Sequence, residues 1–170
     1  MSHGFSCALN YSNLTHRLTA LSQSTRPQSG PINAKPQAVP MRILVIEDDA
    51  IARRVLELFL KPYGTIETAK NGDEGFAKFT EAHQSGDTYD LLCLDINIPG
   101  KAGLEVLSEV REFESVRSAP RAVSAIMLTG SADEGQIAKA KELGAIGYLL
   151  KPVLESDLVA LLGKLGIEPV

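Results

Sequence analysis

Apolar residues along this chain follow two kinds of pattern. Short continuous or alternating runs, typical of strands, occupy residues 43–46, 65–69, 91–94, 122–128 and 146–150. Apolar residues three or four positions apart predict helices over residues 51–59, 76–82, 103–113, 133–143 and 154–162. Strands and helices therefore alternate, which predicts a parallel sheet covered by helices on both faces.

The number of these units limits the fold class. Five strand–helix units in about 130 residues are too few for an eightfold barrel, which needs roughly 250 residues. The remaining common architecture is an α/β fold with a doubly wound, five-stranded parallel sheet and five helices. Its expected strand order is 2-1-3-4-5.

One strand carries a candidate chemical group at its end. The apolar run from Leu91 to Leu94 leads directly into Asp95, and Pro99-Gly100 then turns the chain away. An uninterrupted apolar run fits a strand buried on both faces. Asp95 is therefore expected at the carboxyl end of a central strand, where ligands bind in open α/β sheets. Taken alone, Asp95 also fits a residue that simply begins a turn.

Polar residues also follow three other strands. Glu47-Asp48-Asp49 ends the first strand, Thr129 the fourth and Lys151 the fifth. Because the carboxyl ends of parallel strands share one edge, these side chains are expected to converge with Asp95. Clustered carboxylates suit Mg²⁺, and one carboxylate can form an aspartyl phosphate. Lys151 and Thr129 can then bind phosphoryl oxygens.

Each residue of this group also has a purely structural interpretation. The acidic run is suited to capping the first helix, and Thr129 to an ordinary helix cap. Lys151 alone fits a solvated surface charge. The order of an acidic pair, an Asp, a Thr and a Lys-Pro on four strand ends favours a phosphoryl-transfer site over four unrelated caps.

At these positions the chain resembles a known family. From Met41 to about Gly166 it is similar to the CheY-like receiver domains of two-component response regulators. The segments that carry the resemblance are residues 43–49, Asp95-Ile96-Asn97-Ile98-Pro99 with Gly103, Thr129-Gly130, and residues 144–152 ending in Lys151-Pro152. The departures are small: Ile98 stands where the family commonly has Met, and Lys101-Ala102 where it has Met-Asp.

The resemblance implies a role for each matching residue. Asp95 would be the phosphoacceptor, with Thr129 and Lys151 as further catalytic residues. Thr129 and Tyr148 would be the switch residues, and the peptide bond before Pro152 would be cis. The implied cofactor is Mg²⁺, held by Glu47, Asp48, Asp95 and the backbone carbonyl of Asn97.

The resemblance also implies partners. A histidine kinase or a histidine phosphotransfer protein would phosphorylate Asp95, and the chain itself would catalyse both the gain and the loss of the phosphoryl group. A downstream effector protein would read the changed surface. About one helix follows Lys151, so a stand-alone receiver is expected. The sequence leaves open whether phosphorylation produces a dimer.

Three other classes fit parts of this pattern. A phosphatase of the haloacid dehalogenase type would have a second Asp where this chain has Asn97. A flavodoxin-type binder would need a phosphate loop after the first strand, where the carboxylates from Glu47 to Asp49 would repel phosphate. A pseudo-receiver, a protein-binding module that no longer takes phosphate, would share the whole fold.

Composition and charge exclude few further classes. The 44% hydrophobic and 22% charged residues are ordinary for a globular protein, and the net charge of −4 disfavours direct nucleic-acid binding. No apolar run reaches the roughly 18 residues of a membrane helix. Cys7 and Cys93 form no motif for a disulfide framework or zinc. A cytoplasmic location and no membrane insertion are therefore expected.

Residues 1–40 differ in composition from the receiver-like residues 41–170. They contain no Asp or Glu and are rich in Ser, Asn, Gln and Pro. This composition predicts a disordered or poorly ordered N-terminal extension. It also resembles an organelle transit peptide, and Met41 is an alternative start of the protein.

Overall fold

The computed structural model describes residues 39–117 and 121–170. Its elements are β1 (Met41–Ile46), α1 (Ala50–Leu60), the short 3₁₀ helix η3 (Lys61–Tyr63), β2 (Gly64–Ala69), α2 (Gly72–Ser85), β3 (Leu91–Asp95), α3 (Gly103–Val116), β4 (Ser124–Thr129), α4 (Glu134–Glu142), β5 (Gly147–Leu150) and α5 (Glu155–Lys164). Each strand and helix expected from the sequence is present. The predicted extension, residues 1–40, lies outside the described residues except for its last two.

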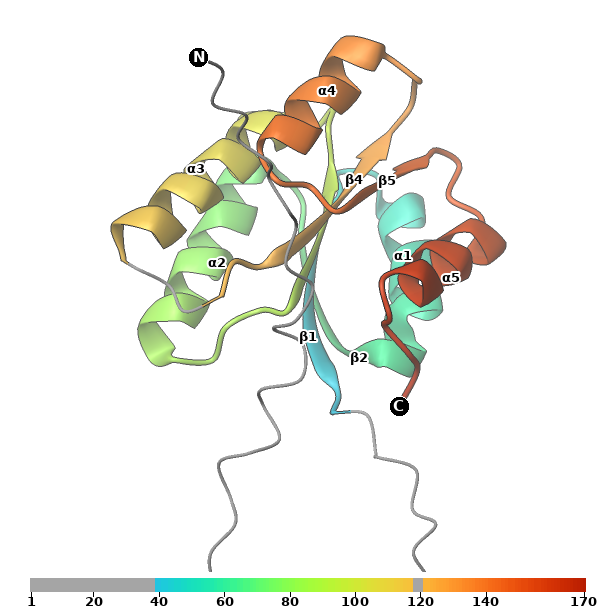
Figure 1. Cartoon of the computed structure of the whole chain (residues 1–170), viewed down its shortest axis with the longest axis horizontal. Coiled ribbons are helices and arrows are strands. Elements are labelled where there is room, and N and C mark those ends of the chain that lie inside the picture. The colour runs from blue at the N-terminus through green and yellow to red at the C-terminus, as the bar shows by residue number, and fades with distance from the viewer. Residues whose placement is uncertain (1–38, 118–120) are drawn as a thin grey trace, which may run out of the picture. The chain divides into compact units, whose positions relative to one another are not determined.

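The five strands form one parallel sheet in the order β2-β1-β3-β4-β5 (Figure 1). This order confirms the predicted doubly wound α/β fold. The ladder between β3 and β4 ends with Asp95 opposite Leu128. The ladder between β4 and β5 ends with Thr129 opposite Leu150. The register therefore brings the last residues of these strands to one edge of the sheet.

Helices cover both faces of the sheet. Helices α1 and α5 lie on one face, and α2, α3 and α4 lie on the other (Figure 1). The first face packs residues such as Ile43, Val45, Cys93, Ile126, Leu56, Leu60, Leu158 and Leu162. The second face packs residues such as Leu44, Ile46, Leu92, Leu94, Met127, Phe79, Val106 and Val110. Strand β3 is buried along its whole length, as its unbroken apolar run predicts.

The buried side of α1 differs from the apolar stripe that the sequence predicts. Leu56 and Leu60, one turn apart, are buried against the sheet. The apolar residues whose spacing predicts this helix are Ile51, Val55, Leu58 and Phe59. Of these, Ile51 and Leu58 are 77% and 55% exposed. Helical spacing identifies a face, but it does not decide which of two overlapping apolar faces the sheet covers.

Helix α3 is longer than the sequence predicts. The apolar spacing predicts a helix over residues 103–113, and the polar residues 115–121 with their Pro predict a loop, but the helix continues to Val116. The carboxylate of Glu114 is buried and accepts a hydrogen bond of 2.6 Å from the backbone N–H of Val123. This contact with the residue just before the next strand stabilises a last turn whose polar sequence favours a loop.

Candidate functional site

The predicted site residues meet at the carboxyl edge of the sheet. Glu47 follows β1 directly, and its backbone N–H donates to the carbonyl of Ala69 at the end of β2. Asp95 is the last residue of β3. Lys151 follows β5, and its backbone N–H donates to the carbonyl of Thr129 over 2.7 Å. The ends of β1, β3, β4 and β5 therefore bring the four functional segments together at one edge of the sheet. The peptide bond between Lys151 and Pro152 is cis, as the resemblance implies.

An ion-paired group of three side chains forms the centre of the site. The ammonium Nζ of Lys151 donates to Asp95 Oδ2 over 2.6 Å and to Glu47 Oε1 over 2.8 Å. Both carboxylates are buried. Burial lowers the pKa of Lys151, but its hydrogen bonds to the two carboxylates outweigh that effect and leave the pKa raised. Burial also raises the pKa of Glu47 and outweighs the opposite influence of Lys151.

The same carboxylates form a set of oxygen ligands. One carboxylate oxygen from each of Glu47, Asp48 and Asp95 lies within 4.8 Å of the others. Glu47 Oε2 is buried and within ion-pair distance of Lys151, but it has no hydrogen-bond partner among the described residues. A carboxylate oxygen can accept more than one partner, so a hard cation or its bound water can bind this oxygen in addition to Lys151. The three residues offer one carboxylate oxygen each, and only Asp48 is exposed. Oxygen ligands of this kind, with room for water, suit Mg²⁺.

The acidic run after β1 divides into two roles. Asp49 Oδ1 accepts hydrogen bonds from the backbone N–H groups of Ile51, over 2.9 Å, and Ala52, over 2.7 Å. Asp49 is therefore the N-cap of α1, and the bond from Ala52 is the largest of the effects that lower its pKa. The capping interpretation holds for Asp49, whereas Glu47 and Asp48 lie in the carboxylate cluster.

The two predicted switch residues take no part in the ion pairs of Lys151. Thr129 is buried, and its hydroxyl donates to the carbonyl of Ser131 over 2.7 Å. Tyr148 is 47% exposed, and Lys141 Nζ lies 5.8 Å from the centre of its ring. Asn97 borders the centre directly, because its backbone N–H donates to Asp95 Oδ1 over 3.0 Å.

Arg53 also contributes to the site, although no sequence motif identified it. Its guanidinium Nη1 donates to the backbone carbonyl of Glu47 over 2.7 Å and to that of Asp48 over 3.2 Å. Arg53 lies in the first turn of α1, where the helix dipole disfavours a cation. That unfavourable placement is the one sequence signal that could have pointed to a specific role.

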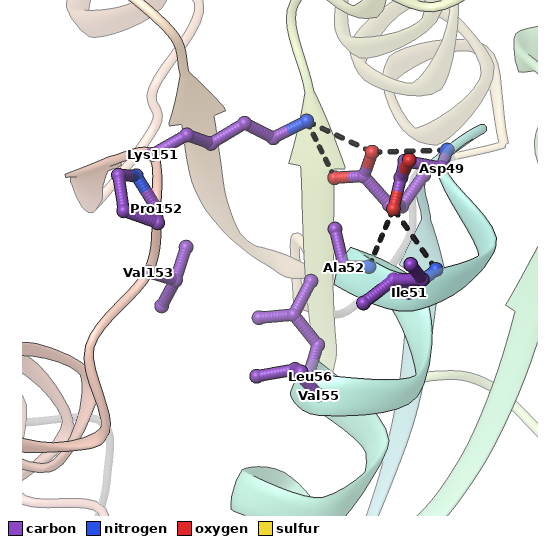
Figure 2. A pocket seen from close by; sticks show the side chains of 9 residues that line it. Asp49, Ile51, Ala52, Val55, Leu56, Lys151, Pro152 and Val153 are labelled. Carbon is purple, nitrogen blue, oxygen red and sulfur yellow. Dashed lines mark hydrogen bonds and ion pairs between the residues drawn. The ribbon is translucent and has the colours of Figure 1, made fainter.

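An apolar groove of about 460 Å³ adjoins the site between α1 and the segment that follows β5 (Figure 2). Ile51, Ala52 and Val55 line one side, and Pro152 and Val153 line the other. Glu47 and Lys151 belong both to the lining of this groove and to the charged centre. In Figure 2 the side chain of Lys151 reaches across the top of the groove toward the start of α1.

The chain belongs to the response regulator receiver domain family, whose model matches residues 43–163. It is 34% identical over 112 residues to the chemotaxis protein CheY of Pseudomonas aeruginosa, covering 66% of this chain and 85% of that protein. It is 36% identical over 119 residues to the transcriptional regulatory protein ResD of Bacillus subtilis, covering 69% of this chain and 45% of ResD.

Solved structures agree with this assignment. One chain in the co-crystal structure of the Saccharomyces cerevisiae histidine phosphotransfer signaling protein Ypd1 and the receiver domain of its downstream response regulator Ssk1 matches with a TM-score of 0.64 and 26% identity. The match covers 76% of this chain and 92% of that chain.

Family membership connects the chain to phosphorylation-based two-component signalling. Receiver domains bind Mg²⁺ at an acidic pocket and interact with phosphotransfer proteins. This chain has an acidic cluster of Glu47, Asp48 and Asp95 that could hold a metal ion. The chain spans about half the length of some of the curated relatives it matches, ResD among them. Within the described part of the chain, no helix combines the length and the apolar character that crossing a membrane requires.

Proposed function

We propose that residues 41–170 are a phospho-accepting receiver domain in which Asp95 takes a phosphoryl group from a histidine. The observation that carries the proposal is the 2.6 Å contact between Lys151 Nζ and Asp95 Oδ2 inside a cluster of three carboxylates. The phosphoryl donor would be a histidine kinase or a histidine phosphotransfer protein, acting in the cytoplasm. Mg²⁺ would be held by Glu47, Asp48, Asp95 and the backbone carbonyl of Asn97.

The chemistry follows from the residues around Asp95. A carboxylate oxygen of Asp95 forms the new O–P bond as the N–P bond to the donor histidine breaks, and the freed imidazole nitrogen takes up a proton from water. Lys151, already hydrogen-bonded to Asp95, supplies a cation for a phosphoryl oxygen. The backbone N–H of Asn97 keeps the other carboxylate oxygen oriented. When bound, Mg²⁺ neutralises negative charge on the phosphoryl oxygens and the carboxylates.

Phosphorylation would act on a surface through Thr129 and Tyr148. The Thr129 hydroxyl now bonds within its own loop, so it can exchange the Ser131 carbonyl for a phosphoryl oxygen. Tyr148 lies partly exposed on β5, and its inward turn would alter the surface of α4, β5 and α5. Leu150 is 54% exposed beside it. This is the surface that a downstream effector protein would read.

The apolar groove beside the site supports a docking position for the phosphoryl donor. A donor histidine has to approach Asp95 from the open edge of the sheet, and the groove shares Glu47 and Lys151 with that edge. The side chain of Ile51 is exposed on this face. A docked protein could bury this apolar side chain and remove it from water. The phosphoryl donor that would fit this groove is a protein with an apolar surface next to its phosphohistidine.

Phosphorylation with a small donor tests the proposal. The full chain is incubated with acetyl phosphate and Mg²⁺, and its intact mass is measured beside that of an Asp95→Asn variant. The expected result is a phosphoryl-sized mass gain in the parent that is absent from the variant. No gain with acetyl phosphate or with a phosphohistidine donor would overturn the proposal and favour the pseudo-receiver. An equal gain in the variant would overturn the assignment of Asp95.

A further inference from the structure

Arg53 makes a contact that an ordinary surface arginine does not make. A single guanidinium nitrogen, Nη1, donates to the carbonyl of Glu47 over 2.7 Å and to the carbonyl of Asp48 over 3.2 Å. The neighbouring Arg54 shows the ordinary case. It is 70% exposed and forms an ion pair of 2.6 Å with Glu57 one turn later on the same helix. Exposed pairs of that kind contribute little to stability.

The two carbonyls that Arg53 binds belong to the peptide groups on either side of Asp48. The carbonyl of Glu47 lies in the peptide bond before Asp48, and the carbonyl of Asp48 lies in the peptide bond after it. Because the two peptide planes meet at the Cα atom of Asp48, holding both fixes the direction in which its side chain leaves the backbone. Arg53 therefore orients Asp48 without touching its carboxylate in this arrangement.

Asp48 needs such a restraint more than its two neighbours do. The side chain of Glu47 is buried and bonded to Lys151, and that of Asp49 caps α1. The carboxylate of Asp48 is exposed but lies within 4.8 Å of those of Glu47 and Asp95. Like charges at that distance repel, and rotation of the flanking peptides would let an exposed carboxylate move away. The cationic Arg53 opposes that rotation.

We propose that Arg53 is a positioning residue for the Mg²⁺ site, holding the Asp48 carboxylate in place through the backbone of residues 47 and 48. The inference rests on the proposed function only in taking this cluster as the Mg²⁺ site. Residues that orient metal ligands from outside typically change metal affinity by roughly 10–100-fold when they are mutated. The loss of Arg53 is expected to weaken Mg²⁺ binding within that range.

Direct measurement of Mg²⁺ binding tests the inference. The full chain and its variants are titrated with MgCl₂ by calorimetry, and phosphorylation by acetyl phosphate is followed over the same range of Mg²⁺. Arg53→Ala is expected to raise the dissociation constant for Mg²⁺ roughly 10–100-fold, with the phosphorylation rate largely restored at saturating Mg²⁺. Arg54→Ala, the matched control on the adjacent position, is expected to bind Mg²⁺ as the parent does.

A second variant separates positioning from folding. Arg53→Lys keeps a cation that can reach one carbonyl, so its dissociation constant is expected between those of the parent and of Arg53→Ala. If Arg53→Ala unfolds, Arg53→Lys alone decides the outcome. An unchanged dissociation constant in the folded variants, or an equal loss in Arg54→Ala, would overturn the inference. A parent that binds no Mg²⁺ would overturn both the metal site and this role, whereas a parent that binds Mg²⁺ but takes no phosphoryl group would contradict the proposed function alone.

Discussion

Lys151 Nζ lies 2.6 Å from Asp95 Oδ2, although 56 positions separate the two residues in the chain. They meet because β3 and β5 both flank β4 and run parallel to it, so their carboxyl ends stop at one edge. The contact joins a candidate phosphoacceptor to the segment that follows β5. A phosphoryl group that competes for Lys151 would thereby act on β5 and its exposed Tyr148.

Glu47 is expected to lower the stability of the protein without metal at neutral pH. Burial raises the pKa of Glu47, so the folded chain holds this proton more tightly than the unfolded chain does. The resulting stability is present below the ordinary pKa of 4.5 and is lost as pH rises through the folded pKa. Glu47→Gln should therefore be more stable than the parent at pH 7 without Mg²⁺ and gain nothing near pH 4.

Urea unfolding at these two pH values, with and without Mg²⁺, measures this effect. Added Mg²⁺ should reduce or reverse the advantage of Glu47→Gln, because an amide is a poorer ligand than a carboxylate and metal binding stabilises the folded state. A variant that is no more stable than the parent at pH 7 without Mg²⁺ would contradict the prediction.

Position 103 is expected to require a glycine, because it packs against the backbone of Asp95, the candidate phosphoacceptor. A Cβ atom built on Gly103 would lie 2.0 Å from the backbone oxygen of Asp95, and that oxygen cannot move without shifting the end of β3. Gly103→Ala is expected to destabilise the fold by about 1–3 kcal/mol. It should also slow phosphorylation of Asp95, because the reacting carboxylate shifts with its backbone.

The control for Gly103 is Gly163, near the end of α5, where an added Cβ has no heavy atom within 4 Å. In a helix, Gly163→Ala should stabilise the protein by about 0.5–1 kcal/mol. The two urea midpoints are compared with that of the parent. Equal midpoints for the two variants would show that the close approach at Gly103 is tolerated.

The sheet and the charged centre could be predicted because each depends on a local signal and one topological rule. Asp95 ends an apolar run, and Lys151 follows another, so each position is readable from the residues just before it. Parallel pairing then brings such ends together whatever their distance in sequence. Thr129 was placed at the same edge by the same rule, and its register opposite Leu150 agrees.

Other features depend on side-chain directions that no local pattern encodes. Asp48 and Asp49 are chemically identical neighbours, yet one lies in the carboxylate cluster and the other caps α1. Ile51 is apolar and at helical spacing, but it projects away from the sheet. The contact of Arg53 depends on a long side chain reversing toward the preceding loop. Each outcome depends on the direction that a side chain takes, which the residue type and spacing alone do not specify.

Cys93 is expected to be chemically inert in the folded protein. Its side chain is fully buried in β3, and burial raises the pKa of the thiol to about 12. Because the thiolate is the reactive form, almost no nucleophile is present at pH 8. In a Cys7→Ser background, which leaves one thiol, a disulfide reagent should show no rapid labelling of the folded chain and one thiol in urea. Rapid labelling without denaturant would contradict the buried position.

Glu114 is expected to join α3 to the start of β4 and, through Arg111, to the end of α4. Its carboxylate accepts from the backbone N–H of Val123 over 2.6 Å and pairs with Arg111 over 2.7 Å. Arg111 also donates to the carbonyl of Leu143, directly after α4, over 2.9 Å. Glu114→Ala leaves the amide of Val123 without its partner, which is expected to destabilise the fold by about 1–3 kcal/mol.

Glu112, exposed two positions earlier on the same helix, gives the matched control. Glu112→Ala is expected to change the free energy of unfolding by no more than about 0.5 kcal/mol. Urea unfolding compares the two variants, and hydrogen exchange at the amide of Val123 reports the contact itself. Glu114→Ala should speed exchange at that amide well beyond the change in global stability, because the amide loses its acceptor. Equal stability of the two variants, with unchanged exchange at Val123, would show that the buried carboxylate does not tie α3 to β4.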